Sequence, residues 1–166
     1  MHRMTAVSVA IILALVGALT GACNEAERNA EGQVQISGDL SVYDLRTGDC
    51  FNGGPRVAEE VGRERTVDQV TAVPCDEAHE NEVFAVFEHP GAMEARFPGE
   101  EAVNQVAQDG CLERFAGYVG RPYAGSDLQV AVIAPGEKSW AEEDDRTILC
   151  IVYGEERLTG SQKAGA

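Results

Sequence analysis

The chain has 166 residues and carries 28 acidic against 13 basic side chains, a formal net charge of −15 at pH 7. This acidic excess argues against nucleic-acid binding and against electrostatic docking on anionic lipid, because both need clustered Lys and Arg. The length suits one domain with a single core, and we find no internal repeat. The acidity is typical of the solvated surface of an exported protein.

The first 22 residues are typical of a targeting signal. Arg3 is followed by an apolar run over residues 6–19, which is shorter than the roughly 20 residues of a membrane-spanning helix. Small residues then precede Cys23, as in bacterial lipoproteins, although Thr20 stands where an aliphatic residue is usual. We predict that a lipoprotein signal peptide of residues 1–22 is removed and that lipid on Cys23 tethers the protein to the extracytoplasmic face of the cell membrane. The alternatives are a plain secretory signal cut nearby and an uncleaved N-terminal anchor.

Composition divides the rest of the chain into three parts. Residues 23–38 contain Asn, Glu, Gln and Gly with few large apolar residues, which predicts a flexible tether. We predict that residues 39–161 form the folded domain. We predict that residues 162–166 form a disordered tail.

Two β-branched runs organise the middle of the domain. Residues 67–73 and 82–87 are separated by a polar segment, which predicts a strand, a turn and a second strand. Both faces of the second strand are apolar, so we expect it to be covered on both sides. Cys75 lies at the end of the first strand and His79 lies in the turn.

A helix follows the central strands. Apolar residues at helical spacing predict a helix that begins near Glu100 and ends at Gly120. Gly110 lies inside this helix, where it costs about 1 kcal/mol of helix propensity relative to alanine but permits close packing on the sheet. Residues 128–134 and 147–153 predict a second hairpin with a long connection. The fold class that these elements predict is α+β, a small antiparallel sheet with one principal helix packed on it.

Four cysteines remain in the body of the chain, and in an exported protein they most often pair as disulfides. Of the three connectivities that four cysteines allow, we prefer Cys50 with Cys75 and Cys111 with Cys150. This pairing joins neighbouring N-terminal segments and fastens the helix to the last strand. A zinc site is disfavoured because there is no Cys-x-x-Cys and the cysteines are spread over the domain. We expect neither a metal nor a cofactor.

Candidate catalytic groups are few. His79 lies in the acidic segment 76–82, which could hold a divalent cation or raise the pKa of the imidazole, but Val83 stands where a His-Glu-x-x-His motif needs its second histidine. We favour a structural role, in which the imidazole hydrogen-bonds the turn backbone beside Cys75. Ser126 lacks the Gly-x-Ser-x-Gly elbow of serine hydrolases. We assign no catalytic residue and expect the protein not to be an enzyme.

Short motifs follow one another in a fixed order along the domain. They are Asp44-Leu45-Arg46 with Gly48-Asp49-Cys50-Phe51, Val73-Pro74-Cys75 with His79 and Glu82-Val83, Cys111 in a helix, Ser139-Trp140 with Asp145-Arg146 and Cys150, and Leu158-Thr159-Gly160-Ser161. Together they resemble the septum-formation domain of actinobacterial exported and membrane proteins, over about residues 40–161. Asp144 stands where the resemblance leads us to expect Gly before the Asp-Arg pair. The resemblance implies an extracytoplasmic domain linked to cell division, with no catalytic residues to carry over.

The resulting hypothesis is a non-enzymatic binding or scaffolding module related to septum formation. Its expected partners are the membrane, through the lipid anchor, and an envelope or division protein, with no nucleic acid. The alternative is a ligand-binding or sensing lipoprotein of the cell envelope. A pocket lined by convergent polar groups would favour the alternative, whereas an exposed apolar patch would favour the scaffold.

Overall fold

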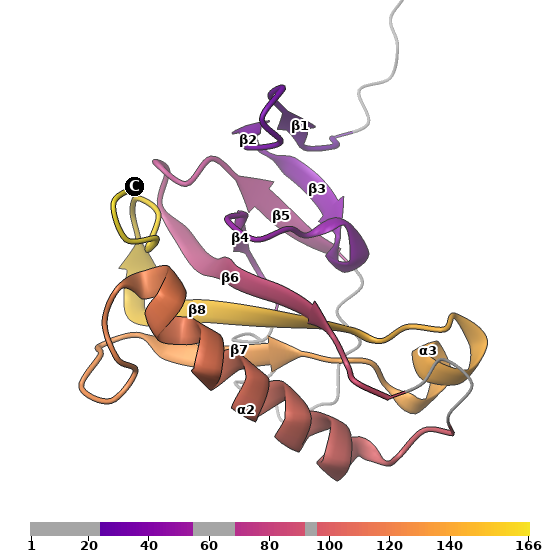
Figure 1. Ribbon diagram of the computed structural model, residues 1–166. Coiled ribbons are helices and arrows are strands. Elements are labelled where there is room, and N and C mark those ends of the chain that lie inside the picture. The colour runs from indigo at the N-terminus through magenta and orange to yellow at the C-terminus, as the bar shows by residue number, and fades with distance from the viewer. Residues whose placement is uncertain (1–23, 55–68, 92–95) are drawn as a thin grey trace, which may run out of the picture.

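The computed structural model describes residues 24–54, 69–91 and 96–166 (Figure 1). The predicted signal peptide and Cys23 therefore lie outside the described residues. The elements, in chain order, are β1 (Glu27–Arg28), β2 (Val34–Ile36), β3 (Gly38–Ser41), the 3-10 helix η1 (Val42–Asp44), β4 (Cys50–Asn52), β5 (Gln69–Val73), β6 (His79–Glu88), α2 (Glu100–Val119), β7 (Gln129–Ile133), α3 (Glu137–Glu142) and β8 (Thr147–Leu158). None of the helices in this part of the chain combines the length and the apolarity needed to cross a bilayer.

The core of the molecule is a six-stranded antiparallel sheet with the strand order β3-β5-β4-β6-β8-β7. β6 and β8 are its longest strands and lie side by side, with Val83 opposite Ile151 and Phe87 opposite Ile148. β1 and β2 form a separate two-stranded sheet beside the β3 edge (Figure 1). The long, β-branched sequences of the central strands account for this arrangement, because such side chains pack well on a pleated surface.

The middle of the sheet differs from the predicted hairpin. β5 and β6 are not neighbours, because β4 lies between them, with Cys50 opposite Val73 on one side and opposite Glu82 on the other. β4 has only three residues and leads into an Asn-Gly-Gly sequence, which is typical of a loop, so the sequence pattern hides it. β6 also begins earlier than predicted, at His79, which makes this residue part of a strand. The second predicted hairpin, β7 with β8, is confirmed.

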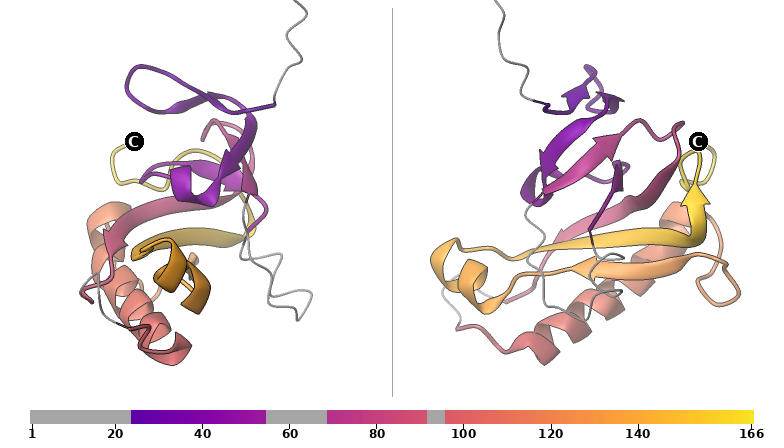
Figure 2. Two further views of the ribbon diagram at one scale, coloured as in Figure 1. Left: turned by 90° about the vertical axis from the view of Figure 1, so that its right-hand side faces the viewer. Right: turned by 180° about the vertical axis from the view of Figure 1, so that it is seen from behind.

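α2 lies across one face of the sheet, over β6, β7 and β8 (Figures 1 and 2). Its buried side chains pack on that face in a first core cluster, formed by Phe84, Ala85, Ala107, Cys111, Phe115, Tyr118, Leu128, Ile148, Cys150 and Val152. A Cβ on Gly110 would collide with the ring of Phe87, so the glycine lets the helix approach the sheet as predicted. The predicted fold class, an α+β domain with one principal helix on an antiparallel sheet, is confirmed.

A second core cluster occupies the opposite face of the sheet. It contains Val42, Leu45, Phe51, Val70, Val83, Leu149 and Ile151. Successive residues of a strand point to opposite faces, so Val83 belongs to this cluster while Phe84 faces the helix. The prediction that β6 is covered on both sides is therefore confirmed.

Both predicted disulfides are present. Cys50–Cys75 joins β4 to the turn that follows β5, across 25 positions of sequence, and Cys111–Cys150 joins α2 to β8 across 39. On the loop-entropy argument each bridge stabilises the fold by roughly 3–4 kcal/mol.

Both ends of the described chain are more ordered than predicted. The flexible tether predicted for residues 23–38 is instead folded from residue 24 onward, because it carries β1 and β2 and pairs with β3 through the bridge between Glu25 and Asp39. The disordered tail predicted for residues 162–166 is instead docked, since the Ala164 N–H donates to the carbonyl of Tyr118 at 2.8 Å. These contacts extend the folded unit beyond the predicted limits of 39–161.

Candidate functional site

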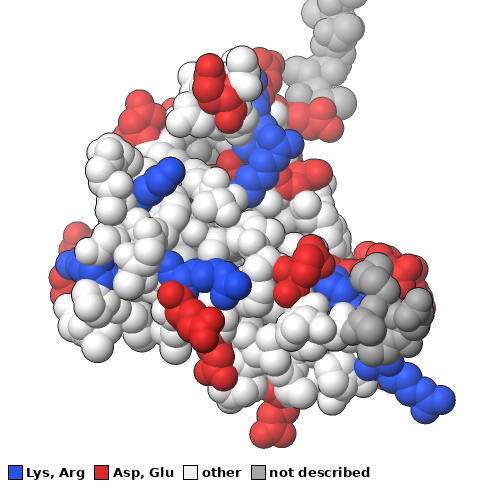
Figure 3. Space-filling model, in the orientation of Figure 1, with Lys and Arg blue, Asp and Glu red and all other residues white. Residues whose placement is uncertain are grey.

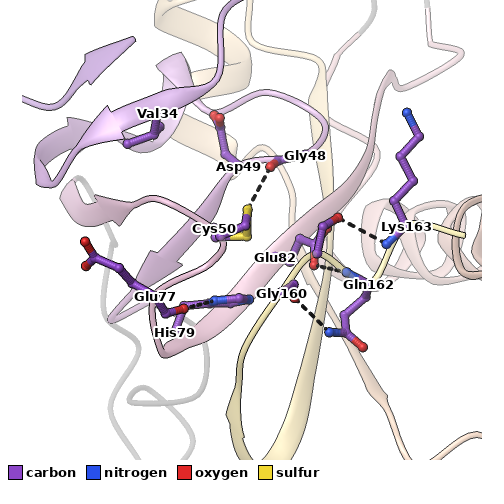
Figure 4. Close-up of a disulfide and its surroundings, with 12 residues drawn as sticks. Val34, Gly48, Asp49, Cys50, Glu77, His79, Glu82, Gly160, Gln162 and Lys163 are labelled. Atoms are coloured by element: carbon purple, nitrogen blue, oxygen red, sulfur yellow. Dashed lines mark hydrogen bonds between the residues drawn. A yellow bond between two sulfur atoms is a disulfide. The ribbon is translucent and has the colours of Figure 1, made fainter. Parts of the chain in front are cut away.

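A buried carboxylate, Glu82 of β6, is at the centre of the principal polar cluster. Its side chain is fully buried, and its Oε1 accepts hydrogen bonds from the hydroxyls of Tyr118 and Ser161, each at 2.6 Å. Its Oε2 accepts the backbone N–H of Gln162, also at 2.6 Å (Figure 4). A buried carboxylate is costly unless it is hydrogen-bonded, and these donors from α2 and the C-terminal segment provide that compensation.

Tyr118 occupies the last turn of α2, where helical spacing places it on the same buried side as Phe115. Burial, together with the hydrogen bond to Glu82, raises the pKa of Tyr118 well above its usual value. The hydroxyl therefore stays protonated at neutral pH and remains a donor to the carboxylate. In this way the cluster ties the end of α2 to β6.

His79, the first residue of β6, lies beside both the Cys50–Cys75 bridge and Glu82 (Figure 4). The imidazole is fully buried, and its Nδ1 lies 2.8 Å from the carbonyl oxygen of Glu77. The expected hydrogen bond from His79 to the turn backbone is thus present. The Nε2 atom of this ring has no hydrogen-bond partner among the residues that the structure describes.

The ligand-type atoms of Cys50, His79 and Glu82 all lie within 4.8 Å of one another. In this structure Cys50 is joined to Cys75, so its sulfur is not a thiolate and is a poor metal ligand. The group is therefore a junction of a disulfide, an imidazole and a carboxylate, with one ring nitrogen unused.

A second polar cluster surrounds Arg146, which is almost fully buried just before β8. Its guanidinium carbon lies 3.6 Å from the ring centroid of Trp140, and its Nη1 donates to the Trp140 carbonyl at 3.0 Å. His89 packs edge-on against the same indole at 5.0 Å between centroids. Burial lowers the pKa of His89, and the charge of Arg146 lowers it further. Cation–π and stacking contacts thus hold α3 against the start of β8.

A third polar contact joins the N-terminal segment to the domain. Arg28 of β1 binds the carboxylate of Asp49 with both terminal nitrogens, at 2.6 and 2.7 Å. Asp49 is only 4% exposed and also accepts the Arg46 N–H at 2.7 Å. The hydrogen bond to Asp49 raises the pKa of the Arg28 guanidinium.

Most of the residues that form these polar clusters could not be identified from the sequence. Glu82 and Tyr118 are 36 positions apart, and no local pattern indicates that they meet. Arg28 lies in a segment whose composition is typical of a tether. Ser126, weighed as a nucleophile, instead accepts the Leu128 N–H in a turn at 3.2 Å.

Fold and clusters together define a small disulfide-bonded α+β domain whose buried polar groups hold its elements together. The family model described as Septum formation matches residues 47–164, and the chain belongs to this family. Neither a curated protein nor a solved structure matches the chain. The family assignment supports a septum-related role.

The residues matched by the family model include some of the polar contacts described above and exclude others. Asp49, Glu82, Tyr118 and the docked C-terminal residues up to 164 lie within it, whereas Arg28 lies before it. Asp144, which stands where the resemblance implied glycine, has a φ of 52°, the left-handed conformation that glycine adopts most readily. The backbone of this turn is therefore the one that a glycine would favour.

Proposed function

We propose that this protein is a non-enzymatic binding module in septum formation, which a lipid on Cys23 holds close to the extracytoplasmic face of the cell membrane. The family assignment supports the septum-related role, and the small residues before Cys23 support the lipid. The observation that carries the proposal is the attachment of residues 24–28 to the domain.

This attachment begins at the first described residue. The carbonyl of Asn24 accepts the Asp39 N–H at 2.5 Å, and Ala26 donates to the Asp39 carbonyl at 3.2 Å. A lipid on Cys23 would thus be about one residue, or roughly 3.5 Å of chain, from the folded unit. A flexible tether over residues 24–38 would instead let the domain move over roughly 20 Å. The short connection supports a module that works at a fixed height above the membrane.

The buried polar groups support a role other than catalysis. A catalytic group must contact its substrate, yet His79 and Glu82 are fully buried, and three donors already occupy Glu82. Their contacts join β6 to α2 and the C-terminal segment, so their effect is on the fold.

The surface offers contacts for a protein partner. On the face shown in Figure 3, Asp and Glu side chains are dispersed over a mostly uncharged surface. Among the described residues, the exposed large apolar side chains are Ile36, Tyr43, Val86, Leu112 and Tyr123. Aromatic and aliphatic side chains of this kind are common in protein interfaces, and they are suitable positions for probes.

The anchor is tested by fractionating cells that express the wild type and Cys23→Ser. We expect the wild type in the membrane fraction, with a lipid-modified Cys23 peptide by mass spectrometry, and the variant released or mislocalised. Membrane retention of an unlipidated Cys23→Ser protein would show an uncleaved anchor and contradict the lipid.

The binding role is tested by placing a photo-crosslinking residue at Tyr43 or Leu112 in intact dividing cells, with the exposed position Glu156 as control. We expect Tyr43 or Leu112 to capture a defined envelope or division protein and Glu156 to capture it less. Failure of both positions to yield a protein adduct, with normal folding, would contradict the scaffold and favour the ligand-binding alternative.

A further inference from the structure

The unused nitrogen of His79 is in the form that metal ligands adopt. A carbonyl oxygen can only accept, so the Nδ1 atom 2.8 Å from the Glu77 carbonyl must carry the ring proton. The Nε2 lone pair is therefore free, and it lies in a fully buried position without a partner among the described residues. Metal-binding histidines almost always donate their other ring N–H in this way, because that bond fixes the tautomer and the ring orientation.

Once the disulfide is absent, the atoms around this nitrogen are of the types that bind zinc. Cys50 Sγ and a Glu82 oxygen lie within 4.8 Å of the imidazole and of each other. Cys75 Sγ is bonded to Cys50 Sγ but contacts the Gly48 carbonyl at 3.3 Å, so it would join this group only after reduction and a rotation of the Cys75 side chain. Two thiolates, one imidazole and one carboxylate make a four-ligand set of the kind that tetrahedral zinc takes.

Glu82 retains capacity for a metal. Its Oε1 accepts two hydroxyl donors, which use the two lone pairs of that atom. Among the residues that the structure describes, its Oε2 accepts only the Gln162 N–H, so one lone pair on Oε2 is left. The existing hydrogen bonds would then orient the carboxylate, as outer partners of metal ligands do.

From this arrangement we propose that the dithiol form of the chain, before Cys50 and Cys75 are joined, binds one zinc ion through both thiolates, His79 Nε2 and Glu82. The proposal stands independently of the function proposed above. Zinc–sulfur bonds of about 2.3 Å in a tetrahedral site place two sulfurs roughly 3.8 Å apart, so the Cys75 side chain would have to rotate toward His79 after reduction. Cys75 is half-buried and Cys50 is fully buried, so the Cys75 side of the site is the side nearer to solvent.

The chemistry balances without a further redox partner in the newly made chain, whose cysteines are still thiols. Binding releases the two thiol protons to solvent and forms two zinc–sulfur bonds. In the purified protein the disulfide must first accept two electrons from a phosphine and two protons from water, and the oxygen of that water forms the phosphine oxide.

The test is a titration of the phosphine-reduced mature chain with cobalt(II) and zinc(II) in the absence of oxygen. We expect one ion per chain, a thiolate-to-cobalt charge-transfer band, and no such band in the oxidised chain. His79→Gln should weaken binding roughly tenfold or more. His89→Gln is the matched control and should bind like the wild type, because His89 packs on Trp140 instead.

Two further measurements assign the site. Cys50→Ser with Cys75→Ser should abolish the charge-transfer band, whereas Cys111→Ala with Cys150→Ala should retain it. If reduction unfolds the domain, zinc added before the phosphine should preserve the far-ultraviolet circular dichroism of the wild type but not of His79→Gln. Equal affinity in His79→Gln, a cobalt spectrum without thiolate bands, or loss of fold with and without zinc alike would overturn the proposal.

Discussion

Arg28 and Asp49 are joined by two parallel hydrogen bonds, at 2.6 and 2.7 Å, although 21 positions of sequence separate them. The same guanidinium donates to the Gly32 carbonyl at 2.8 Å, so it also closes the loop between β1 and β2. One side chain thus fixes both the local shape of the N-terminal segment and its place on the domain. Bidentate contacts of this kind depend on the planar geometry of the guanidinium group as well as on its charge.

Arg28→Ala should lower the free energy of unfolding by roughly 1–3 kcal/mol, because it leaves the almost fully buried Asp49 with fewer donors. Amide hydrogen exchange should become faster over residues 25–39. Arg28→Lys should be intermediate, since it keeps the charge but loses the paired geometry. Arg121→Ala is the exposed control. Unchanged exchange in Arg28→Ala would show that the segment is held by other contacts.

Tyr118 should make stability fall at alkaline pH. Its pKa is raised in the folded state relative to about 10 in the unfolded chain, so its contribution is complete below about pH 10 and is lost as the pH rises through the folded-state pKa. Urea unfolding should therefore show a steeper decline above about pH 10 for the wild type than for Tyr118→Phe. At neutral pH the variant should be about 1 kcal/mol less stable, because Glu82 loses one donor.

Tyr123→Phe provides the control for this titration, because it keeps the ring contact with Phe115 while removing a more exposed hydroxyl. It should follow the wild-type pH profile. Parallel profiles for the wild type and Tyr118→Phe would mean that the Tyr118 hydroxyl titrates normally in the fold.

Gly110→Ala should destabilise the protein by roughly 1–3 kcal/mol, even though alanine is the better helix former by about 1 kcal/mol. The added Cβ would collide with the Phe87 ring and move α2 off the sheet. Gly117→Ala in the same helix has nothing within 4 Å of its added Cβ and should stabilise by up to about 1 kcal/mol. Denaturant midpoints of the two variants should shift in opposite directions, and a shift in the same direction would refute the close-packing argument.

Asp144→Gly should stabilise the turn before Arg146 by up to about 1 kcal/mol, because it removes the strain of a side chain at φ 52°. Glu143→Gly should do the reverse, since Glu143 has an ordinary φ of −121° and glycine there only adds freedom to the unfolded chain. Thermal unfolding of both variants measures the difference. A loss of stability in Asp144→Gly would mean that the aspartate side chain compensates for its backbone conformation.

The parts of the fold that could be predicted are those that a local pattern specifies. α2, β7 and β8 follow from helical and alternating apolar spacing. Cys111–Cys150 follows from the packing of the helix on the last strand, and Cys50–Cys75 is the pair that remains. β4 could not be predicted, because three residues are too few to show a period. Its position between β5 and β6 is set by pairing with both.

The candidate site was harder to predict than the fold, because its contacts are non-local. His79 was identified from the sequence as an imidazole in an acidic segment. Its hydrogen bond to the Glu77 carbonyl is local, because the two residues are two positions apart. The role of Glu82 depends on Tyr118 and Ser161, which are 36 and 79 positions away. In the sequence Glu82 is one of several carboxylates, and only the packing of α2 and the C-terminal segment singles it out.

The crossing of residues 24–26 over Gly38 has a mechanical consequence. Any side chain at position 38 would collide with the backbone of Glu25, so the two segments touch directly at the β3 edge. A pull on the chain before residue 24 would therefore be transmitted directly into the β-sheet. If the proposed lipid on Cys23 holds the domain at the membrane, bending of that membrane would rotate and load the domain itself, whereas a flexible linker would absorb the force.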